Sequence, residues 1–308
     1  MFAPFRPYRH RDATHLASCI SHPSGSRNHV VEINPFEYTH TMRETTKQSF
    51  ILLPILLALS SLSAYAVTSL PLPAERFEVN GRTAFVMPSE QPAKGAPWVW
   101  YAPTLRAHPD SSHAFYFESL LAQGVAIAGY DLGDVRGSAR SSQQFTAFYD
   151  AMVEKGYSTK PILLGQSRGG LMMLCWAFRN PGKVGAFAGI YPVCNLTSWP
   201  LQQVKGSVLA DYGLSEEELM QSLATLNPPE NLAGLAENGV PMFMVHGDVD
   251  TVVPYEENSG RIKEAYEQVG GEVEVKVVPG KGHEVVPEFF KCQELLEFIV
   301  NQTGQKQQ

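Results

Sequence analysis

The sequence predicts an α/β domain with a doubly wound, mainly parallel β-sheet, helices on both faces and a small helical cap. Three observations support this fold class. Short apolar runs of buried-strand length alternate with helix-like segments between residues 96 and 300. One such run leads directly into a serine flanked by glycines and then into a helical pattern. Acidic residues and a histidine follow later strands, where functional groups collect in open α/β sheets.

The first expected element is a hairpin, because residues 76–80 and 82–88 flank Asn80-Gly81, a dipeptide that favours tight turns. Apolar runs bounded by turn residues define the other strands, and periodic segments define the helices. The further strands are expected over residues 96–101, 125–130, 161–164, 184–191, 240–245 and 272–278, and the helices over 111–123, 142–155, 171–179 and from Cys292 onward.

The segment Gly165-Gln166-Ser167-Arg168-Gly169-Gly170 joins the strand over 161–164 to a helix. A sharp strand-to-helix turn would lift the Ser167 hydroxyl above the sheet, and the glycines would let the strand and the helix approach closely. The alternative is a glycine-rich helix start that only packs on the sheet. The strand before the turn and the helix after it favour Ser167 as a nucleophile.

A serine hydroxyl is a weak nucleophile at neutral pH, so it needs a base, and the base needs an acid that orients it. His283 lies on a glycine-flanked loop after the strand over 272–278, as a base should. Asp250 lies just past the strand over 240–245, with Asp248 as the alternative acid. His246 is expected to have a structural role at the end of that strand.

With these motifs, residues 76–300 resemble the α/β-hydrolase superfamily, on its esterase and prolyl-oligopeptidase-like side. The resemblance rests on residues 165–169, 246–254 and 282–283, in this order along the chain. It implies the hydrolase fold and a catalytic triad of Ser167, Asp250 and His283. The pattern His-Gly-x-x-Asp-x-x-Val-Pro selects Asp250 over Asp248.

In this family an oxyanion hole combines the backbone N–H after the nucleophile with a donor from the loop after the third strand. The first donor corresponds to Arg168. The loop corresponds to residues 101–104, where many relatives carry His-Gly, and Pro103 has no N–H to donate. The second donor is therefore Ala102, Thr104 or the hydroxyl of Tyr101. The alternative for Tyr101 is a half-buried aromatic residue at a strand end.

A cap is expected over about residues 195–227, the usual place for a lid in this fold, with Ser215 and Glu218 as a capping box. Trp199 and Tyr212 are candidate substrate contacts in the cap, with packing beneath it as the alternative.

Arg168 is a further candidate for binding the substrate. The chain resembles glucuronoyl esterases in its Ser-Arg pair, and a guanidinium there would favour an anionic or sugar-acid substrate. The alternative is an ion pair of Arg168 with Asp131 or Asp134.

The N-terminal segments are expected to lie outside the fold. Residues 1–41 are interpreted as a disordered upstream extension, and residues 42–66 as a signal peptide with a basic start, a short apolar run and Ala64-Tyr65-Ala66. Residues 67–308 then form the hydrolase domain of a secreted or periplasmic protein, with no stable membrane insertion after cleavage. Without residues 1–66, 18 basic and 27 acidic residues remain, a net charge of −9 that argues against nucleic acid as a partner.

Three cysteines remain in the expected domain. Cys175 is expected to be a buried free thiol, and Cys194 and Cys292 could pair in an exported protein. No cluster of histidines and cysteines has the spacing of a metal site, so no metal and no cofactor are expected. The oligomeric state stays open.

The sequence therefore predicts an exported serine hydrolase that cleaves small-molecule or polysaccharide-linked carboxylic esters. One alternative is a prolyl-oligopeptidase-like peptidase, although the large propeller that gates such enzymes is not recognisable in the sequence. The other is a non-catalytic binding protein of the same fold, whose usual sign is a missing triad residue, and none is missing here.

Overall fold

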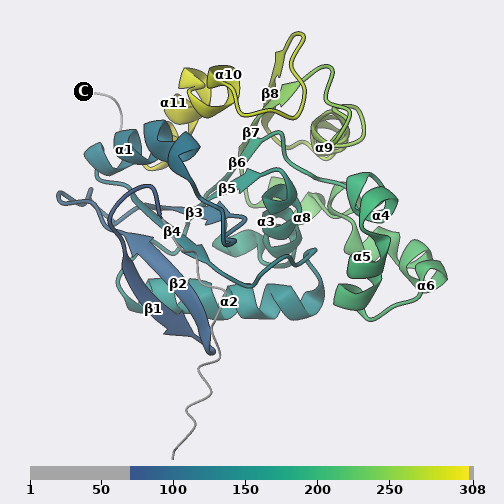
Figure 1. Cartoon of the computed structure of the whole chain (residues 1–308), viewed down its shortest axis with the longest axis horizontal. Helices are drawn as coiled ribbons and strands as arrows, with labels where there is room; N and C mark the ends of the chain where they lie inside the picture. The colour runs from purple at the N-terminus through teal and green to yellow at the C-terminus, as the bar shows by residue number, and fades with distance from the viewer. Residues whose placement is uncertain (1–69, 305–308) are drawn as a thin grey trace, which may run out of the picture. The chain divides into compact units, whose positions relative to one another are not determined.

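The computed structural model describes residues 70–304, which carry one eight-stranded sheet in the order β1-β2-β4-β3-β5-β6-β7-β8 (Figure 1). β1 and β2 pair antiparallel with each other, and β2 pairs antiparallel with β4. All pairs from β4 to β8 are parallel, which confirms the predicted fold class. The strands are β1 Glu75–Val79, β2 Arg82–Met87, β3 Trp98–Ala102, β4 Ala126–Tyr130, β5 Ile162–Gln166, β6 Ala186–Ile190, β7 Met242–Gly247 and β8 Val273–Val278.

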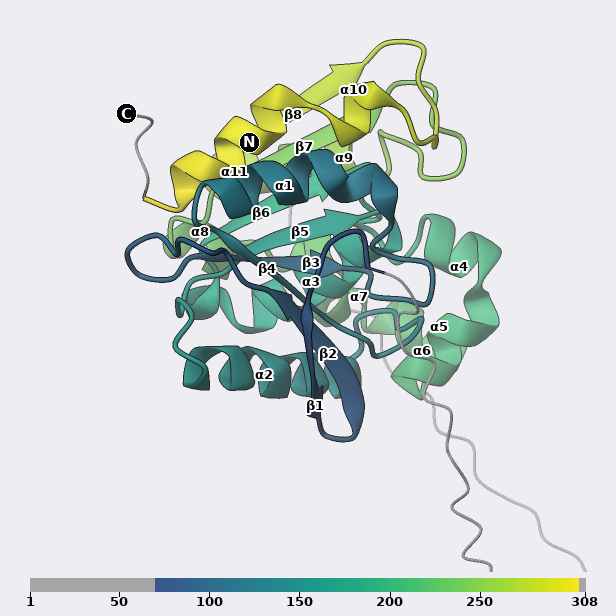
Figure 2. The same ribbon diagram turned by 60° about the vertical axis from the view of Figure 1, so that its left-hand side comes forward.

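Helices cover both faces of the sheet (Figure 2). α1, α10 and α11 lie on one face, and α2, α3, α8 and α9 lie on the other. Four short helices, α4 to α7, follow β6 in the segment where a cap is expected. The helices are α1 Ala114–Ala122, α2 Ala139–Glu154, α3 Arg168–Arg179, α4 Trp199–Gln203, α5 Lys205–Tyr212, α6 Glu216–Gln221, α7 Leu223–Leu226, α8 Ala233–Glu237, α9 Ser259–Gln268, α10 Pro287–Phe290 and α11 Gln293–Gln302, with short 3-10 turns at Ser111–His113, Pro181–Lys183 and Pro228–Glu230.

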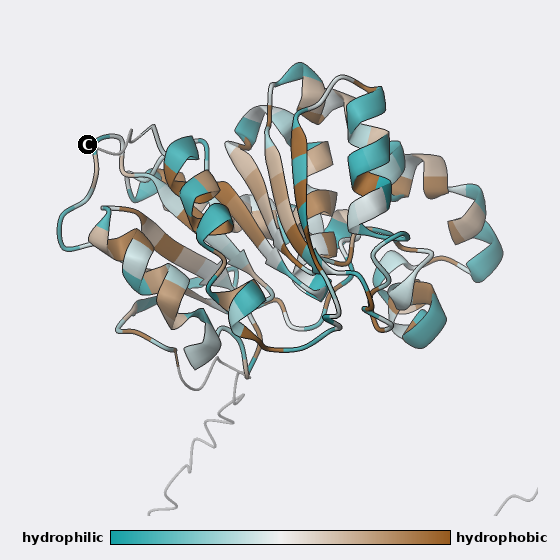
Figure 3. Ribbon diagram, turned by 90° about the horizontal axis from the view of Figure 1, so that it is seen from above, coloured by the Kyte–Doolittle hydropathy of each residue, from teal (hydrophilic) through white to brown (hydrophobic). Residues whose placement is uncertain are grey.

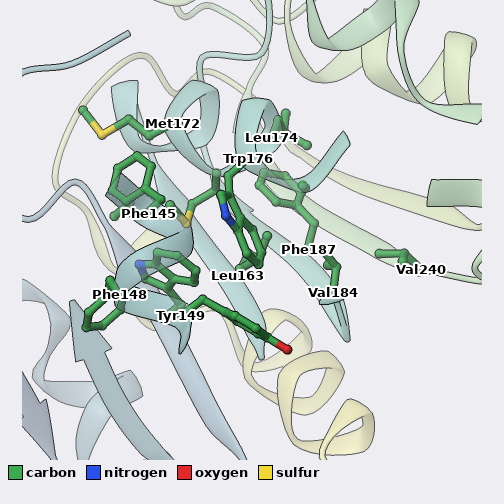
Figure 4. Packing of buried hydrophobic residues seen from close by; sticks show 14 of the residues in the cluster. Phe145, Phe148, Tyr149, Leu163, Met172, Leu174, Trp176, Val184, Phe187 and Val240 are labelled. Carbon is green, nitrogen blue, oxygen red and sulfur yellow. The ribbon is translucent and has the colours of Figure 1, made fainter. Parts of the chain in front are cut away.

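A hydrophobic core lies on each face of the sheet, because successive side chains of a strand point to opposite faces. On β3, Trp98 and Trp100 enter the core beneath α2 and α3, whereas Val99 and Tyr101 enter the core beneath α1 and α11. Figure 4 shows the first core around Trp176 of α3. In Figure 3 the apolar residues gather on the central strands, and hydrophilic residues occupy much of the outward helix surface.

Most predicted elements agree with the structure to within a few residues. The helix expected from residue 142 begins at Ala139, because the Ser138 hydroxyl accepts a hydrogen bond from the Ser141 N–H and caps the helix. The capping box of Ser215 and Glu218 is confirmed at the start of α6. Helices α8, α9 and α10 were not predicted, since their short or mixed patterns do not stand out from loop sequence.

The expectations for residues 1–41 and 42–66 lie outside the described residues. Within residues 70–304, no helix has the length and apolar character that crossing a membrane requires. Cys175, Cys194 and Cys292 are all buried free thiols, so the possible pairing of Cys194 with Cys292 is not formed.

Candidate active site

Ser167 occupies the sharp turn between β5 and α3. Its φ of +47° lies in the left-handed region, which non-glycine residues rarely adopt outside functional turns. The Ser167 N–H donates to the Ile190 carbonyl at 3.0 Å, and the Ser167 carbonyl accepts from the Val193 N–H at 2.8 Å. Backbone hydrogen bonds to the end of β6 therefore hold the turn on both sides of the serine.

The glycines around Ser167 allow an unusually close approach of backbone segments. A Cβ atom on Gly169 would lie 2.0 Å from the carbonyl oxygen of Ala102 at the end of β3. A Cβ on Gly165 would lie 2.6 Å from the Cα of Gly170, and one on Gly170 would lie 2.4 Å from Pro192. Only glycine fits at these three positions without moving backbone or ring atoms.

The structure brings Ser167, His283 and Asp250 together from three separate loops. The Ser167 Oγ lies 2.9 Å from His283 Nε2, and His283 Nδ1 lies 2.7 Å from Asp250 Oδ2. An imidazole with its proton on Nδ1 satisfies both contacts, because Nδ1–H donates to the carboxylate and Nε2 accepts from the hydroxyl. The arrangement can therefore take a proton from Ser167 and stabilise the imidazolium that forms.

Asp250 is held as a carboxylate by several donors. Its Oδ1 accepts from the backbone N–H groups of Val252 and Val253 at 2.9 and 2.8 Å. Burial by itself raises the pKa of Asp250, but the contacts with His246, His283 and the Val253 N–H outweigh it and hold the pKa well below its usual value. The group is therefore ionised throughout the neutral pH range.

Asp248 lies outside this chain of hydrogen bonds. Its exposed carboxylate accepts from the Gly280 N–H and so links the loop after β7 to the loop that carries His283. His246 is fully buried, with Nδ1 2.7 Å from the Ser259 hydroxyl and Nε2 2.8 Å from the Val253 carbonyl. The structure thus gives Asp248 and His246 roles in holding the loops that present Asp250 and His283.

The backbone N–H groups of Arg168 and Thr104 are both expected as oxyanion donors. Within residues 70–304, neither of them donates a backbone hydrogen bond outside the regular helices and strands. Arg168 begins α3, so its N–H also benefits from the positive end of the helix dipole. Ala102 remains part of β3, paired with Gly165, and the Thr104 side chain packs toward Gly129 of β4.

The Tyr101 hydroxyl, one of the expected oxyanion donors, is engaged in hydrogen bonds within the core. It donates to Gln166 Oε1 at 2.6 Å and lies 3.0 Å from His113 Nε2, and the Tyr101 side chain is fully buried. The physical reason is strand alternation, since Tyr101 points into the core beneath α1. Tyr101 is a core residue rather than the half-buried one considered as the alternative.

The Arg168 side chain extends from the turn toward Trp199 of α4. Its guanidinium lies 3.0 Å from Asp134 Oδ2, the ion pair considered as an alternative, and 5.3 Å from the ring centre of Trp199. Asp134 also binds the buried Arg136, whose guanidinium lies 5.7 Å from the same indole. Two arginines thus share one carboxylate beside the nucleophile, and the Arg168 side chain remains 36% exposed.

The other two candidate substrate contacts have packing contacts in the structure. Trp199 is partly buried and lies close to both guanidinium groups. Tyr212 donates its hydroxyl to the Arg136 carbonyl at 3.1 Å and lies 3.9 Å from the Cys175 thiol, so it joins α5 of the cap to the body of the domain. These contacts favour the packing role considered for Tyr212.

Sequence reasoning missed a buried polar network beneath the triad, formed by His113, Gln166 and Tyr191. Gln166 Oε1 lies 2.8 Å from His113 Nε2, and Gln166 Nε2 lies 3.4 Å from the Tyr191 hydroxyl. The Tyr191 ring lies 4.2 Å from the His283 ring, centre to centre. The position of Gln166 beside Ser167 was the one available signal, since Tyr191 reads simply as a strand-end aromatic. Among residues 70–304, no group of three or more His, Cys, Asp or Glu side chains could hold a metal ion.

Comparison with known proteins identifies a family and a curated relative. The model of the prolyl oligopeptidase family matches residues 130–306, more than half of the chain. Acyl-protein thioesterase 1 from Gibberella zeae is 28% identical over 157 residues, which cover 50% of this chain and 54% of the relative. The chain thus spans about half the length of that curated relative.

Solved structures share the fold at low sequence identity. Dipeptidyl peptidase 4 from Porphyromonas gingivalis matches with a TM-score of 0.59 and 14% identity, over 74% of this chain and 35% of that one. Est1E from Butyrivibrio proteoclasticus matches with a TM-score of 0.56 and 16% identity, over 76% of this chain and 100% of that one. Both similarities concern the arrangement of strands and helices.

Proposed function

The chain belongs to the prolyl oligopeptidase family of serine hydrolases, and from that premise we propose that it hydrolyses carboxylic esters through an acyl-enzyme on Ser167. The observation that carries the proposal is the continuous chain of hydrogen bonds from the Ser167 Oγ through His283 to Asp250, at 2.9 and 2.7 Å. A full chain of this kind weighs against a binding protein that only retains the fold.

In the proposed reaction, the Ser167 Oγ attacks the acyl carbonyl carbon while its proton passes to His283 Nε2. The negative charge that develops on the carbonyl oxygen is stabilised by the Arg168 N–H and the Thr104 N–H. The bond to the leaving alcohol breaks as His283 returns the proton to the departing oxygen. Water then attacks the acyl-enzyme, gives its proton to His283 and releases the acid, and the proton returns to Ser167.

Support for an ester rather than a peptide comes from the curated relative, whose name describes a thioesterase, since thioesters and oxygen esters are cleaved through the same acyl-enzyme chemistry. A second candidate is a serine peptidase, which the family match and the similarity to a dipeptidyl peptidase favour. Both candidates use the same triad, so the leaving group decides between them. Turnover of p-nitrophenyl esters and of matched p-nitroanilides should therefore be compared on one preparation.

We also propose that Arg168 contacts the substrate and favours either an ester that carries a separate carboxylate or the ester of a sugar acid on a carbohydrate. The proposal is supported by the partial exposure of Arg168 next to the nucleophile and by the two guanidinium groups that share Asp134.

The proposed location is outside the cytoplasm, secreted or periplasmic, on the signal-like pattern of residues 42–66. N-terminal sequencing of the protein recovered from an expressing culture tests the location, and an uncleaved N-terminus would contradict it.

The test of the proposed reaction is hydrolysis of p-nitrophenyl acetate by the wild-type protein and by the Ser167→Ala variant. We expect a clear wild-type rate and a fall of about 10³-fold or more in the folded variant. Equal rates in the two proteins would refute ester hydrolysis by this triad. Faster turnover of the anilides than of the esters would instead favour the peptidase.

A further inference from the structure

Tyr191 lies at the end of β6, directly beside the histidine of the triad. Its ring centre is 4.2 Å from the ring centre of His283, and the two planes are tilted by 49°. Its side chain is only 3% exposed, and its φ of +33° is in the left-handed region. This unusual backbone conformation at the end of β6 accompanies the placement of the ring against the imidazole.

The ring is fixed on both sides. Phe289 and Phe290 of α10 pack against it with ring centres 5.2 and 5.9 Å away, at 87° and 63°. On the other side, the Tyr191 hydroxyl accepts a hydrogen bond of 3.4 Å from Gln166 Nε2. Because Gln166 directly precedes Ser167, one residue connects the turn of the nucleophile with the ring that touches the base.

Gln166 is itself held by a buried network. Its Oε1 accepts from the Tyr101 hydroxyl at 2.6 Å and lies 2.8 Å from His113 Nε2. A neutral His113 with its proton on Nε2 can donate to Gln166 Oε1, and its Nδ1 then accepts from the backbone N–H of Asp110 at 3.2 Å. The same Nδ1 also lies 3.2 Å from the carbonyl oxygen and from Oδ1 of Asp110. Burial is the largest cause of a lowered pKa at His113, which agrees with the neutral form. The network is therefore built to keep Gln166 in one orientation.

We propose that Tyr191 is a positioning residue for His283. The Tyr191 ring holds the His283 imidazole toward Ser167 and stabilises the imidazolium that forms during the reaction. This inference rests on the proposed function in one respect, because the proposed function makes His283 the base that takes the proton from Ser167. A cation placed within about 6 Å of an aromatic ring centre is attracted by the electron-rich face of the ring. Burial raises the pKa of Tyr191 to about 12, so the phenol stays neutral at working pH and acts through its ring.

Other charged groups near His283 do not depend on Tyr191. Asp250 contacts the imidazole directly at 2.7 Å. Lys281 pairs with Glu288 at 3.1 Å, and the carboxylates of Asp248 and Glu284 accept from the backbone N–H groups of Gly280 and Gly282. A substitution at position 191 leaves these groups in place, so a change in the titration of the base reports on the ring.

The experiment replaces Tyr191 with phenylalanine, with leucine, and with phenylalanine analogues of increasing ring fluorination. Fluorination weakens the attraction for a cation and keeps the ring shape nearly constant, so it separates electrostatics from packing. We expect Tyr191→Phe to retain most activity and Tyr191→Leu to lose about 3- to 30-fold in kcat with little change in KM. The acid limb of the pH–rate profile should move stepwise to lower pH with fluorination.

Phe243→Leu is the matched control, because Phe243 is buried in the same core and, within residues 70–304, its ring contact is with Phe298 rather than with Tyr191 or His283. It should lower stability without moving the acid limb. If fluorination and Tyr191→Leu also leave the acid limb in place, the ring is only a packing residue and the inference is wrong. If Tyr191→Leu does not fold, the fluorinated series alone decides.

The rate at which a fluorophosphonate probe labels Ser167 is measured for every variant over the same pH range. This rate depends on activation of the nucleophile and needs no ester substrate. A wild-type protein that is labelled but hydrolyses no ester would contradict the proposed function, and the labelling rates of the fluorinated series would still decide the role of Tyr191.

Discussion

The close approach of α3 to the end of β3 makes Gly169→Ala the sharpest test of the proposed site. The added Cβ would lie 2.0 Å from the carbonyl oxygen, 2.2 Å from the carbonyl carbon of Ala102 and 2.4 Å from the Pro103 nitrogen. Since real Cβ atoms stay about 3.0 Å or more from such atoms, these segments must separate by about 1 Å. All three atoms are backbone atoms, so no side-chain rotation can relieve the overlap.

Overpacking of a well-packed core costs about 1–3 kcal/mol, and a clash with backbone belongs at the upper end of that range. For a domain of this size, about 3 kcal/mol lowers Tm by about 6–12 °C. The loss of activity should be larger than the loss of stability alone would cause. Ala102 and Pro103 directly precede the proposed Thr104 donor, so moving them also moves that donor. A displacement of about 1 Å in such a site can cost about 100-fold in rate.

Thermal unfolding and kcat/KM for p-nitrophenyl acetate measure the two effects. Gly206→Ala in α5 is the matched control, because a Cβ there meets nothing within 4 Å. It should leave activity unchanged and keep or raise stability by up to about 1 kcal/mol. A Gly169→Ala protein with the wild-type Tm and a kcat/KM within a few fold of wild type would refute the argument from close approach.

Two further predictions concern Asp250, one concerns Arg168 and one concerns the expected cap. Asp250→Asn should lower kcat by about 10⁴-fold, while Asp248→Asn should stay within about tenfold; comparable losses would reverse the assignment of the acid. The pKa of Asp250 in the folded protein lies below its unfolded value of 3.8, so the ionised Asp250 stabilises the fold above pH 3.8, and this stabilisation is lost as the pH falls below 3.8. In urea unfolding at a series of pH values, Asp250→Asn should flatten the fall in unfolding free energy on the acid side. Arg168→Gln should raise KM for p-nitrophenyl hemisuccinate about 3- to 10-fold and change KM for the neutral acetate little. An equal effect on both esters would refute the proposed contact between Arg168 and a substrate carboxylate. The Asp211 carboxylate accepts from the backbone N–H of Arg136 at 2.7 Å and from the Ser138 hydroxyl at 2.9 Å. Asp211→Ala should therefore speed limited proteolysis within residues 195–227 while the global Tm changes little. Cleavage of the variant at the wild-type rate would show that these hydrogen bonds do not hold the expected cap.

The candidate triad residues could be predicted from the sequence because each follows a recognisable strand, mainly apolar for β5 and β7 and alternating for β8. Ser167, Asp250 and His283 come after β5, β7 and β8, and parallel strands bring their carboxyl ends to one edge of the sheet. Glycine at 165, 169 and 170 added a second signal, since the close approaches in the structure need that residue type. Local chemistry and sheet topology thus pointed to the same residues.

Side-chain direction was harder to predict where a strand is apolar on both faces. Residues 98–102 of β3 are buried throughout, so the pattern did not indicate which face receives Tyr101. The pairing of β3 with β5 decides it, and that register depends on long-range contacts. The hydroxyl consequently meets Gln166 and His113 in the core, where a single sequence offered no reason to expect it.

The strained positions explain why the network around Tyr191 was also hidden. Ser167 and Tyr191 both have positive φ, and they follow directly after Gln166 and Ile190, which pair at the ends of β5 and β6. Left-handed backbone at non-glycine residues costs about 1–3 kcal/mol each and persists where surrounding structure enforces it. Here the Ser167 N–H is bound to the Ile190 carbonyl and the Tyr191 N–H to the Val245 carbonyl, so three neighbouring strands hold the two turns. Sequence patterns report preferred conformations, and this site is assembled from two residues that depart from them at the same edge of the sheet.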